Sequence, residues 1–453
     1  MFDRQKKGDR AVLVLPHSRG EIDAARRAEE FAELVKSAGA EVLGVISARV
    51  EDPNPRYYIG AGKANELAEA ARALEADLVL VDHVLTPVQE RNLEKHLGIR
   101  VVDRAGLILD IFAQRARSHE GKLEVELAQL KHLATRLVRG WTHLERQRGG
   151  SIGLRGPGET QLETDRRLLQ KRVEQLQKRI DKVGVQRDQQ RRARLRNTLP
   201  RVALVGYTNA GKSTLFNAVT RGAVYAADQL FATLDPTVRR LDGLESGPAV
   251  LADTVGFIRE LPHDLIAAFR ATLSEARDAD LLLHVTDAAD GERDVLVNVV
   301  NGVLDEIGAG SVPQLMVFNK IDLLNAGIPA DEDQQPGIHG PTFREAGPRI
   351  DRDAGGAPVA VWISAASGVG LDLLRQAISE RLAGTRVHAE LRLPPRAGRL
   401  RARLIELGAV KSERYDEDGW CLDIDAPREL LLPLAGDVRG DEASLLRDWL
   451  DAA

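Results

Sequence analysis

The stretch RVALVGYTNAGKST (Arg201–Thr214) decides the fold of this chain. It joins an apolar strand, a loop of the form GxxxxGK[ST] and the start of a helix. In such a loop, successive backbone N–H groups face a phosphate chain, and the N-terminus of the helix adds positive potential. The stretch therefore predicts a parallel α/β sheet with a phosphate site at the end of one strand.

The residues of this loop have different predicted roles. Gly206 and Gly211 let the backbone approach the phosphates closely. Lys212 should reach the β- and γ-phosphate oxygens, and the hydroxyl of Ser213 should ligate Mg²⁺. We expect nucleotide contacts from the whole loop, which comprises Gly206, Tyr207, Thr208, Asn209, Ala210, Gly211, Lys212, Ser213 and Thr214.

A second motif, NKID, selects the base. It follows the apolar run QLMVF. The carboxylate of Asp322 can accept hydrogen bonds from N1–H and the 2-amine of guanine, whereas adenine offers neither donor. Such a site rejects the wrong base by roughly 10⁴-fold or more. Asn319 should brace the loop, the stem of Lys320 should cover the base, and Ser364-Ala365 can supply a backbone N–H to guanine O6. GTP is therefore the predicted substrate.

Two further stretches complete the predicted magnesium site. In DTVG (Asp253–Gly256), Asp253 can hold a Mg²⁺-bound water and the N–H of Gly256 can meet the γ-phosphate. FATLDPT (Phe231–Thr237) lies where a switch loop belongs, and Thr233 can complete the metal shell when the γ-phosphate is present; an ordinary loop threonine is the alternative. The predicted metal ligands are Ser213 and Thr233, with Asp253 acting through water, and the predicted catalytic residues are Lys212, Thr233, Gly256 and Asn209.

Composition narrows the class of protein. For 453 residues, roughly 150 residues per domain predicts about three domains. Hydrophobic residues make up 43% and charged residues 29%, which excludes a wholly disordered chain. The single cysteine, Cys421, excludes internal disulfides and a cysteine-based zinc site. No apolar run approaches the roughly 18 residues of a membrane span, and we read no secretory signal, so we expect a cytoplasmic protein.

Charge is distributed unevenly along the chain. The formal net charge is −5, yet Lys131–Arg201 holds 19 Lys and Arg against 7 Asp and Glu, a local balance of +12 that leaves −17 for the rest. Such segregation indicates a module that faces a polyanion. A solvated, arginine-rich helical hairpin is the alternative.

The pattern upstream of this basic segment predicts a separate α/β domain. Residues 11–115 alternate apolar runs with helical stretches, which indicates a parallel sheet with right-handed crossovers. GAGK (Gly60–Lys63) opens a helix, and it either holds a phosphate or forms a helix-start turn. The expected strands are Ala11–Pro16, Glu41–Ile46, Leu78–Asp82 and Ile99–Asp103, and the expected helices are Glu21–Ala38, Asn65–Glu75 and Pro87–His96.

Two heptad patterns predict an antiparallel helical hairpin. Their 3.5-residue period puts each apolar set on one stripe, which only a partner helix can bury. Between them, the glycines of Arg146–Gln161 predict a non-helical, basic tip. The stripes are Leu123, Leu127, Leu130, Ala134, Leu137, Trp141 and Leu144, then Leu169, Val173, Leu176, Ile180 and Val183.

Alternating strands and helices return over Leu199–Leu382. Within them, Asn325–Pro358 is rich in Pro, Gly and acidic residues and predicts a mobile insertion. After Glu390, a helix over Gly398–Leu407 and two strands around the turn Asp416–Gly419 predict a small α+β appendage. The predicted domains are the N-terminal α/β domain (1–120), the hairpin (121–198), the GTPase domain (199–386, insertion 325–358) and the C-terminal α+β domain (387–453).

In this order, the motifs resemble those of translation-factor-class GTPases, and nearly the whole chain is similar to the HflX family. The most specific string is GLRGPGETQLETDRR (Gly153–Arg167). The long polar insertion at Asn325–Pro358 departs from the family pattern. The other matching strings are PRYYIGAGKANEL, ELAQLKHLATRLVRGWTHLERQRGG, GYTNAGKSTLFN, FATLDPT, DTVGFI, NKID and GRLRA…YDEDG.

The resemblance implies a GTPase that uses Mg²⁺ and binds the large ribosomal subunit and its rRNA. Some members of the family split stalled or idle 70S ribosomes after stress, and ATPase activity and RNA remodelling are also linked to it. It implies that the tip, with Arg146, Arg148 and Arg155, approaches the peptidyl-transferase region. Asn209 stands where several related GTPases ligate K⁺ beside the phosphates. We expect a monomer.

The residue after DTVG bears on the rate of hydrolysis. Many GTPases place a water-orienting glutamine there, and this chain has Phe257, which cannot polarise water. We expect slow hydrolysis by the free protein and stimulation by the ribosome; a different residue of the chain that supplies the function is the alternative. A second hypothesis for the whole chain is an RNA-binding remodelling or adapter protein for which GTP is only a conformational ligand.

Overall fold

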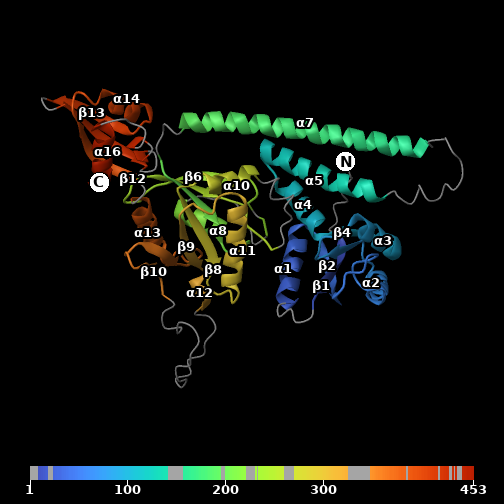
Figure 1. The fold of residues 1–453 in the computed structure, drawn as a ribbon. Helices are drawn as coiled ribbons and strands as arrows, with labels where there is room; N and C mark the ends of the chain where they lie inside the picture. The colour runs from blue at the N-terminus through green and yellow to red at the C-terminus, as the bar shows by residue number, and fades with distance from the viewer. Residues whose placement is uncertain are drawn as a thin grey trace, which may run out of the picture. The chain divides into compact units, whose positions relative to one another are not determined.

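The computed structural model of the protein describes residues 9–18, 24–140, 157–194, 199–220, 230–231, 233–259, 270–324, 347–383, 386–416, 419–427, 431–432, 434–435 and 441–452. Contacts divide the chain into two compact units (Figure 1). The first unit comprises Met1–Val183, Ala226–Asp235 and Ile258–Thr272, and the second comprises Gly184–Tyr225, Pro236–Phe257 and Leu273–Ala453.

A four-stranded parallel sheet, in the order β2-β1-β3-β4, forms the base of the first unit. All four residues of β3 are buried, as in a parallel sheet with both faces covered. The predicted strands and helices are confirmed, and α4 is an additional helix. The strands are β1 (Arg10–His17), β2 (Glu41–Arg49), β3 (Leu78–Val81) and β4 (Arg100–Asp103), and the helices are α1 (Ala24–Ser37), α2 (Ala61–Ala73), α3 (Pro87–Leu97) and α4 (Arg104–Arg115).

Local sequence fixes the ends of the helices in this unit. Thr86 and Gln89 form a reciprocal capping box at the start of α3, and Gly98, with a φ of 74°, ends it. GAGK forms the start of α2, with Gly60 at the N-cap. The helix-start interpretation of GAGK therefore agrees with the structure, and a phosphate there stays a prediction.

Helices α5 (His119–Gly140) and α7 (Pro157–Arg194) pack through the predicted heptad stripes. The buried centre comprises Leu123, Leu127 and Leu176, with Leu130, Val173 and Ile180 packed against it. The prediction for the tip is wrong in part, because α7 begins at Pro157, inside the stretch predicted to be non-helical. Proline suits the first helical position, where no N–H is needed. Trp141, Leu144 and residues 146–156 lie outside the described residues.

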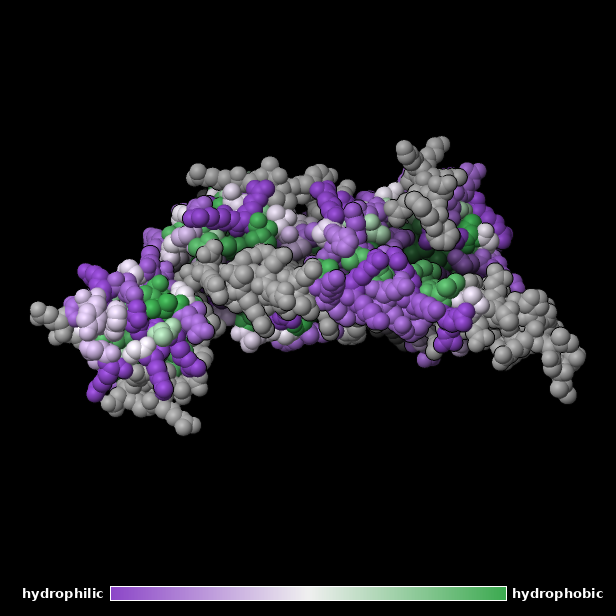
Figure 2. All heavy atoms as spheres, turned by 90° about the horizontal axis from the view of Figure 1, so that it is seen from above, coloured by the Kyte–Doolittle hydropathy of each residue, from purple (hydrophilic) through white to green (hydrophobic). Residues whose placement is uncertain are grey.

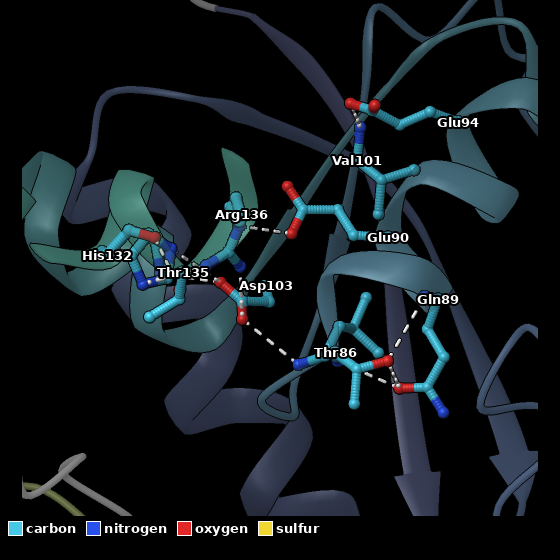
Figure 3. Close-up of polar contacts among 11 residues, drawn as sticks. Thr86, Gln89, Glu90, Glu94, Val101, Asp103, His132, Thr135 and Arg136 are labelled. Carbon is cyan, nitrogen blue, oxygen red and sulfur yellow. Dashed lines mark hydrogen bonds and ion pairs between the residues drawn. The ribbon is translucent and has the colours of Figure 1, made fainter. Parts of the chain in front are cut away.

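An ion-pair cluster fixes α5 to the α/β layer (Figure 3). Arg136 of α5 donates to Glu90 of α3 at 2.6 Å and pairs with Asp103 at 3.0 Å. Asp103, which is 1% exposed, also accepts from the N–H of Gly106 at 2.8 Å and so caps α4. His132 lies 3.8 Å from Asp103. Because breaking such a pair would leave a buried charge uncompensated, the cluster holds α5 in one position on the sheet layer.

The second unit contains a seven-stranded sheet in the order β10-β11-β9-β8-β5-β7-β6. Its five central strands are parallel, and β6 and β10 are antiparallel edges. The strands are β5 (Arg201–Val205), β6 (Thr237–Leu241), β7 (Ala249–Asp253), β8 (Leu281–Asp287), β9 (Gln314–Asn319), β10 (Arg349–Arg352) and β11 (Pro358–Trp362). The helices along this stretch are α8 (Lys212–Thr220), α10 (Arg270–Arg277), α11 (Arg293–Glu306), α12 (Ile321–Leu324) and α13 (Leu371–Ala383).

Part of the predicted mobile insertion is regular structure. Strand β10 lies within Asn325–Pro358 and pairs antiparallel with β11. Trp362 anchors this hairpin: its indole N–H donates to Asp351 at 2.7 Å, and the guanidinium of Arg349 lies 4.1 Å above its ring. The prediction is therefore wrong for the end of the segment, and residues 325–346 lie outside the described part of the chain.

A small α+β module with its own core ends the chain. Its antiparallel sheet has the order β12-β14-β13. The predicted helix and the two strands around Asp416–Gly419 are confirmed, and β12 and α16 are additional. The elements are β12 (Arg386–Leu393), α14 (Gly398–Glu406), β13 (Val410–Asp416), β14 (Gly419–Pro427) and α16 (Asp441–Ala452). Over the described residues, no helix has the length and apolar character that a membrane crossing requires.

Candidate nucleotide site

The predicted motifs follow four strands of the larger sheet, β5, β7, β9 and β11. These strands and β8 run parallel as neighbours, so their carboxyl ends lie at one edge of the sheet. Ligands bind at this edge in open α/β folds. Motifs that are far apart in the sequence therefore meet in one place.

The glycines of the phosphate loop stand where no side chain fits. Gly206 has a φ of 146°, and a Cβ there would lie 2.1 Å from the carbonyl oxygen of Val285. Gly211 has a φ of 92°, and its Cβ would lie 2.3 Å from Nδ2 of Asn319. The loop thus needs glycine at both ends, as the sequence predicts. Asn209 has a φ of 61°, a conformation that asparagine tolerates better than most residues.

Lys212 begins α8 and points back into the loop. Its Nζ donates to the carbonyl oxygens of Gly206 at 3.0 Å and Tyr207 at 2.7 Å. A Cβ added at Gly256 would lie 3.0 Å from the same Nζ, so DTVG passes close to the lysine. The ammonium group is therefore held at the centre of a backbone cradle.

The next side chain reaches the second motif. The hydroxyl of Ser213 donates to the carboxylate of Asp253 at 2.8 Å, and Asp253 is fully buried. This oxygen-only pair fits the ligand preference of Mg²⁺, which takes few protein oxygens and fills its shell with phosphate and water. Ser213 would ligate the ion, and Asp253 would hold one of its waters.

Burial changes the acid–base behaviour of this site. Lys212 is only 6% exposed, and burial lowers its pKa to about 8, although the charge of Asp253 opposes the shift. Burial also lowers the pKa of His284 in β8 to about 4, so this imidazole stays neutral. A bound phosphate would raise the pKa of Lys212 again, because its negative charge favours the protonated ammonium.

DTVG and the phosphate loop are joined by backbone pairing. The N–H of Thr208 donates to the carbonyl of Phe257 at 2.7 Å, and the N–H of Phe257 donates to Gly206 at 3.1 Å. The ring of Phe257 is 2% exposed. The side chain that stands in place of a water-orienting glutamine is therefore packed into the protein interior.

Asn319 connects three motifs through one buried amide. Its Nδ2 donates to the carbonyl of Ala210 in the phosphate loop at 2.9 Å, and its Oδ1 accepts from the N–H of Ala365 at 2.9 Å. Asn319 is 2% exposed, so both bonds are shielded from water. The predicted bracing role of Asn319 agrees with this geometry.

The remaining base-site residues lie beside this bridge. Lys320, with a φ of 65°, forms an ion pair with Asp287 at 2.9 Å, and Asp322 is exposed on α12. Asp287 is a residue that the sequence analysis did not identify, because it ends β8 without belonging to a motif. Ser364 donates its N–H to Val369 at 2.9 Å, and Ala365 donates to Asn319, so the predicted contact to guanine O6 stays a prediction.

Other predicted site residues belong to the first unit or lie outside the described residues. Thr233 belongs to the first unit, whereas Ser213 and Asp253 belong to the second, and its role at the metal stays a prediction. Arg146, Arg148 and Arg155 lie outside the described residues.

Comparison with known families agrees with this geometry. Residues 201–320 match the model of the 50S ribosome-binding GTPases. Residues 25–113 and 115–194 match the models of the N-terminal and middle regions of a GTP-binding GTPase. A protein named GTPase HflX from Escherichia coli (strain K12) is 57% identical over 92% of this chain and 93% of its own length. The chain belongs to the HflX family of GTPases.

Other relatives extend this match. The GTPase HflX of Magnetococcus marinus is 44% identical over 97% of both chains. Among solved structures, a GTP-binding protein from Sulfolobus solfataricus in complex with GDP is 24% identical and covers 83% of this chain and 99% of that one, with a TM-score of 0.44. Family membership in the HflX GTPases is carried by the sequence relatives and the family models.

The lowered pKa of Lys212 predicts proton uptake on nucleotide binding. Below about pH 7 the free lysine is already charged; above its free pKa of about 8 it must gain a proton to meet phosphate. Titration calorimetry with GDP, in two buffers of different ionisation heat, should show Lys212 taking up about 0.8 proton at about pH 8.5 and almost none at about pH 6.5. Equal uptake at both pH values would contradict the assignment.

Proposed function

We propose that this chain hydrolyses GTP with Mg²⁺ at the edge formed by β5, β7, β9 and β11, and that its GTP form docks on the large ribosomal subunit. We propose further that docking serves to dissociate or rescue ribosomes under stress in the cytoplasm. The observation that carries the GTP assignment is the buried amide of Asn319, which joins the phosphate loop to the NKID and Ser364-Ala365 loops.

The pair Ser213 and Asp253 supports the metal assignment, because a hydroxyl and a buried carboxylate meet at 2.8 Å beside Lys212. Bound Mg²⁺ would neutralise charge on the phosphates and orient them. The chain's own groups would hold the phosphates: Lys212 with its ammonium, and Gly256 with its N–H. Thr233 would complete the metal shell in the GTP form.

The positive charge on α7 supports ribosome binding. Among the residues of α7 whose burial is described, the basic side chains are exposed, and much of the molecular face in Figure 2 is hydrophilic. Exposed Lys and Arg on a long helix suit a phosphate-lined surface. The family description of 50S ribosome-binding GTPases agrees with this partner. Within the described part of α7, these exposed basic residues are Arg166, Arg167, Lys171, Arg172, Lys178, Arg179 and Lys182.

The burial of Phe257 supports slow hydrolysis by the free protein, because no water-orienting group stands at this position; we propose that the ribosome stimulates the reaction. This burial also favours the second candidate function, an RNA-binding adapter in which GTP acts only as a conformational ligand. A GTPase assay with and without large subunits separates the two: multiple turnovers with subunits favour the enzyme, and an unchanged slow rate favours the adapter.

Asp322→Asn should move base preference from guanine toward xanthine, because the carboxamide places a donor opposite the 2-amine. The mismatch should cost about 1–3 kcal/mol, or roughly 5- to 150-fold in GTP affinity. Fluorescent-nucleotide titration measures both affinities, and Asp294→Asn on the surface of α11 is the matched control. Unchanged GTP affinity in Asp322→Asn would reject the base-site assignment.

Asn209 is the proposed K⁺ ligand, since a cation there would add positive charge where negative charge develops in the transition state. Hydrolysis should be faster in KCl than in NaCl, and Asn209→Ala should remove the difference. The ratio of the two rates is the informative quantity, because backbone strain from alanine at a φ of 61° would slow hydrolysis equally in KCl and in NaCl. Equal parental rates in the two salts would exclude K⁺.

Replacing Arg146, Arg148 and Arg155 together by alanine should weaken ribosome binding and flatten its log–log salt slope by roughly two to three units. GTP affinity should not change. A control variant with Arg240, Arg277 and Arg392 replaced loses the same charge elsewhere. Binding of large subunits at several salt concentrations measures the slope. Parental affinity and slope in the tip variant would show that the docking surface lies elsewhere.

A further inference from the structure

The segment that carries Thr233 is anchored on both sides within the first unit. Before Thr233, Leu230 and Phe231 are each 3% exposed, and after it Leu234 is also 3% exposed. The ring of Phe231 packs edge-on against Phe112 of α4, with ring centroids 4.7 Å apart. A segment between a phosphate loop and DTVG thus has an apolar docking site of its own.

A carboxylate anchors the end of this segment to α5. Asp235 accepts hydrogen bonds from the backbone N–H groups of Arg117 and Ser118, both at 2.7 Å, and from the hydroxyl of Ser118. The same hydroxyl accepts from the N–H of Gly121 at 2.9 Å. Asp235 therefore sits at the N-terminus of α5, where the helix dipole stabilises an anion.

Gly121 makes room for this carboxylate. A Cβ at Gly121 would lie 2.5 Å from Oδ1 of Asp235 and 2.9 Å from the hydroxyl of Ser118. Alanine is otherwise about 1 kcal/mol better than glycine inside a helix, so glycine here costs helix stability. The carboxylate of Asp235 can therefore reach the start of α5 only because residue 121 has no side chain.

A second contact in the same unit holds the residues that follow DTVG. Arg104 of α4 donates to the carbonyl of Arg259, which follows DTVGF, at 3.0 Å. Arg104 is 3% exposed and also pairs with Asp82 and Glu30. Asp235 and Arg259 are thus both bonded to residues of the first unit, Asp235 to the start of α5 and Arg259 to α4.

We propose that Asp235 is a positioning residue: by docking on the N-terminus of α5 it places the segment of Thr233 for the GTP form, and it links that segment to α5. The proposal rests on the proposed function, in which Thr233 meets Mg²⁺ only with the γ-phosphate. Two anchors on either side leave Thr233 little freedom, which lowers the entropy lost when it is ordered. Helix α5 is about 33 Å long, and its other end is clamped by Asp103 and Glu90.

The test compares GDP with a non-hydrolysable GTP analogue, each with Mg²⁺, on the full chain. Asp235→Asn and Gly121→Ala should each weaken analogue binding by about 5- to 50-fold and leave GDP affinity within about twofold, because only the analogue recruits Thr233. Asp242→Asn, an exposed carboxylate, and Gly302→Ala, where a Cβ would meet open space, are the matched controls.

Hydrogen exchange supplies a second measurement that does not depend on activity. In the parental protein, peptides spanning residues 115–122 should exchange more slowly with the analogue than with GDP, since linkage is reciprocal. Asp235→Asn should erase this difference. Gly121→Ala raises the helix propensity of α5, so this variant should not unfold the helix. Faster exchange at Arg117 and Ser118 in this variant would therefore come from loss of their hydrogen bonds to Asp235.

The outcomes separate this proposal from the proposed function. If the variants lose the same affinity for GDP as for the analogue, or if neither affinity changes, Asp235 has only a structural role. Tighter analogue binding by the variants would mean that docking competes with the nucleotide, which overturns the proposal. If the parental protein binds neither GDP nor the analogue, the proposed function itself fails.

Discussion

The side-chain amide of Asn319 is the contact on which the nucleotide site depends. With one donor and one acceptor it joins the phosphate loop at Ala210 to the loop at Ala365, and its own backbone carries NKID. Both bonds are buried, so replacing Asn319 with an apolar residue would leave a carbonyl and an N–H unpaired away from water, at about 1–3 kcal/mol each. Gly211 has no side chain because the amide occupies that space.

This contact couples the loop that we propose for the phosphates to the loops that we propose for the base. Parallel strands bring the loops to the same edge, but their loops are flexible in principle, and only a shared contact fixes their spacing. Lys212 is drawn in by the carbonyls of Gly206 and Tyr207, and Ser213 by Asp253. The groups that would meet phosphate and metal are therefore held in place by the protein's own polar groups, as preorganised catalysis requires.

Much of this could be predicted from the sequence, because its motifs are local. The loop glycines, the strand ends and the heptad stripes each have a short-range signal, and the loop glycines, the strand ends and the described centre of the stripes occur where predicted. Long-range contacts carry no such signal. A lone carboxylate such as Asp235 is indistinguishable from an ordinary loop residue until α5 is placed beside it, and Asp287 pairs with Lys320 only through the neighbouring strands. Strand β10 could not be predicted for a different reason. Its sequence, RIDR, has three charged residues and resembles the polar sequence before it.

The central claim is that GTP controls docking of this HflX-family protein on the large ribosomal subunit. The most direct measurement is sedimentation of the full chain with isolated large subunits and Mg²⁺, in GDP and in a non-hydrolysable GTP analogue. The account predicts co-sedimentation with the analogue and release with GDP, because in the proposed GTP form Thr233 meets Mg²⁺ only when the γ-phosphate is present. Equal binding in both nucleotides, or none in either, would contradict it.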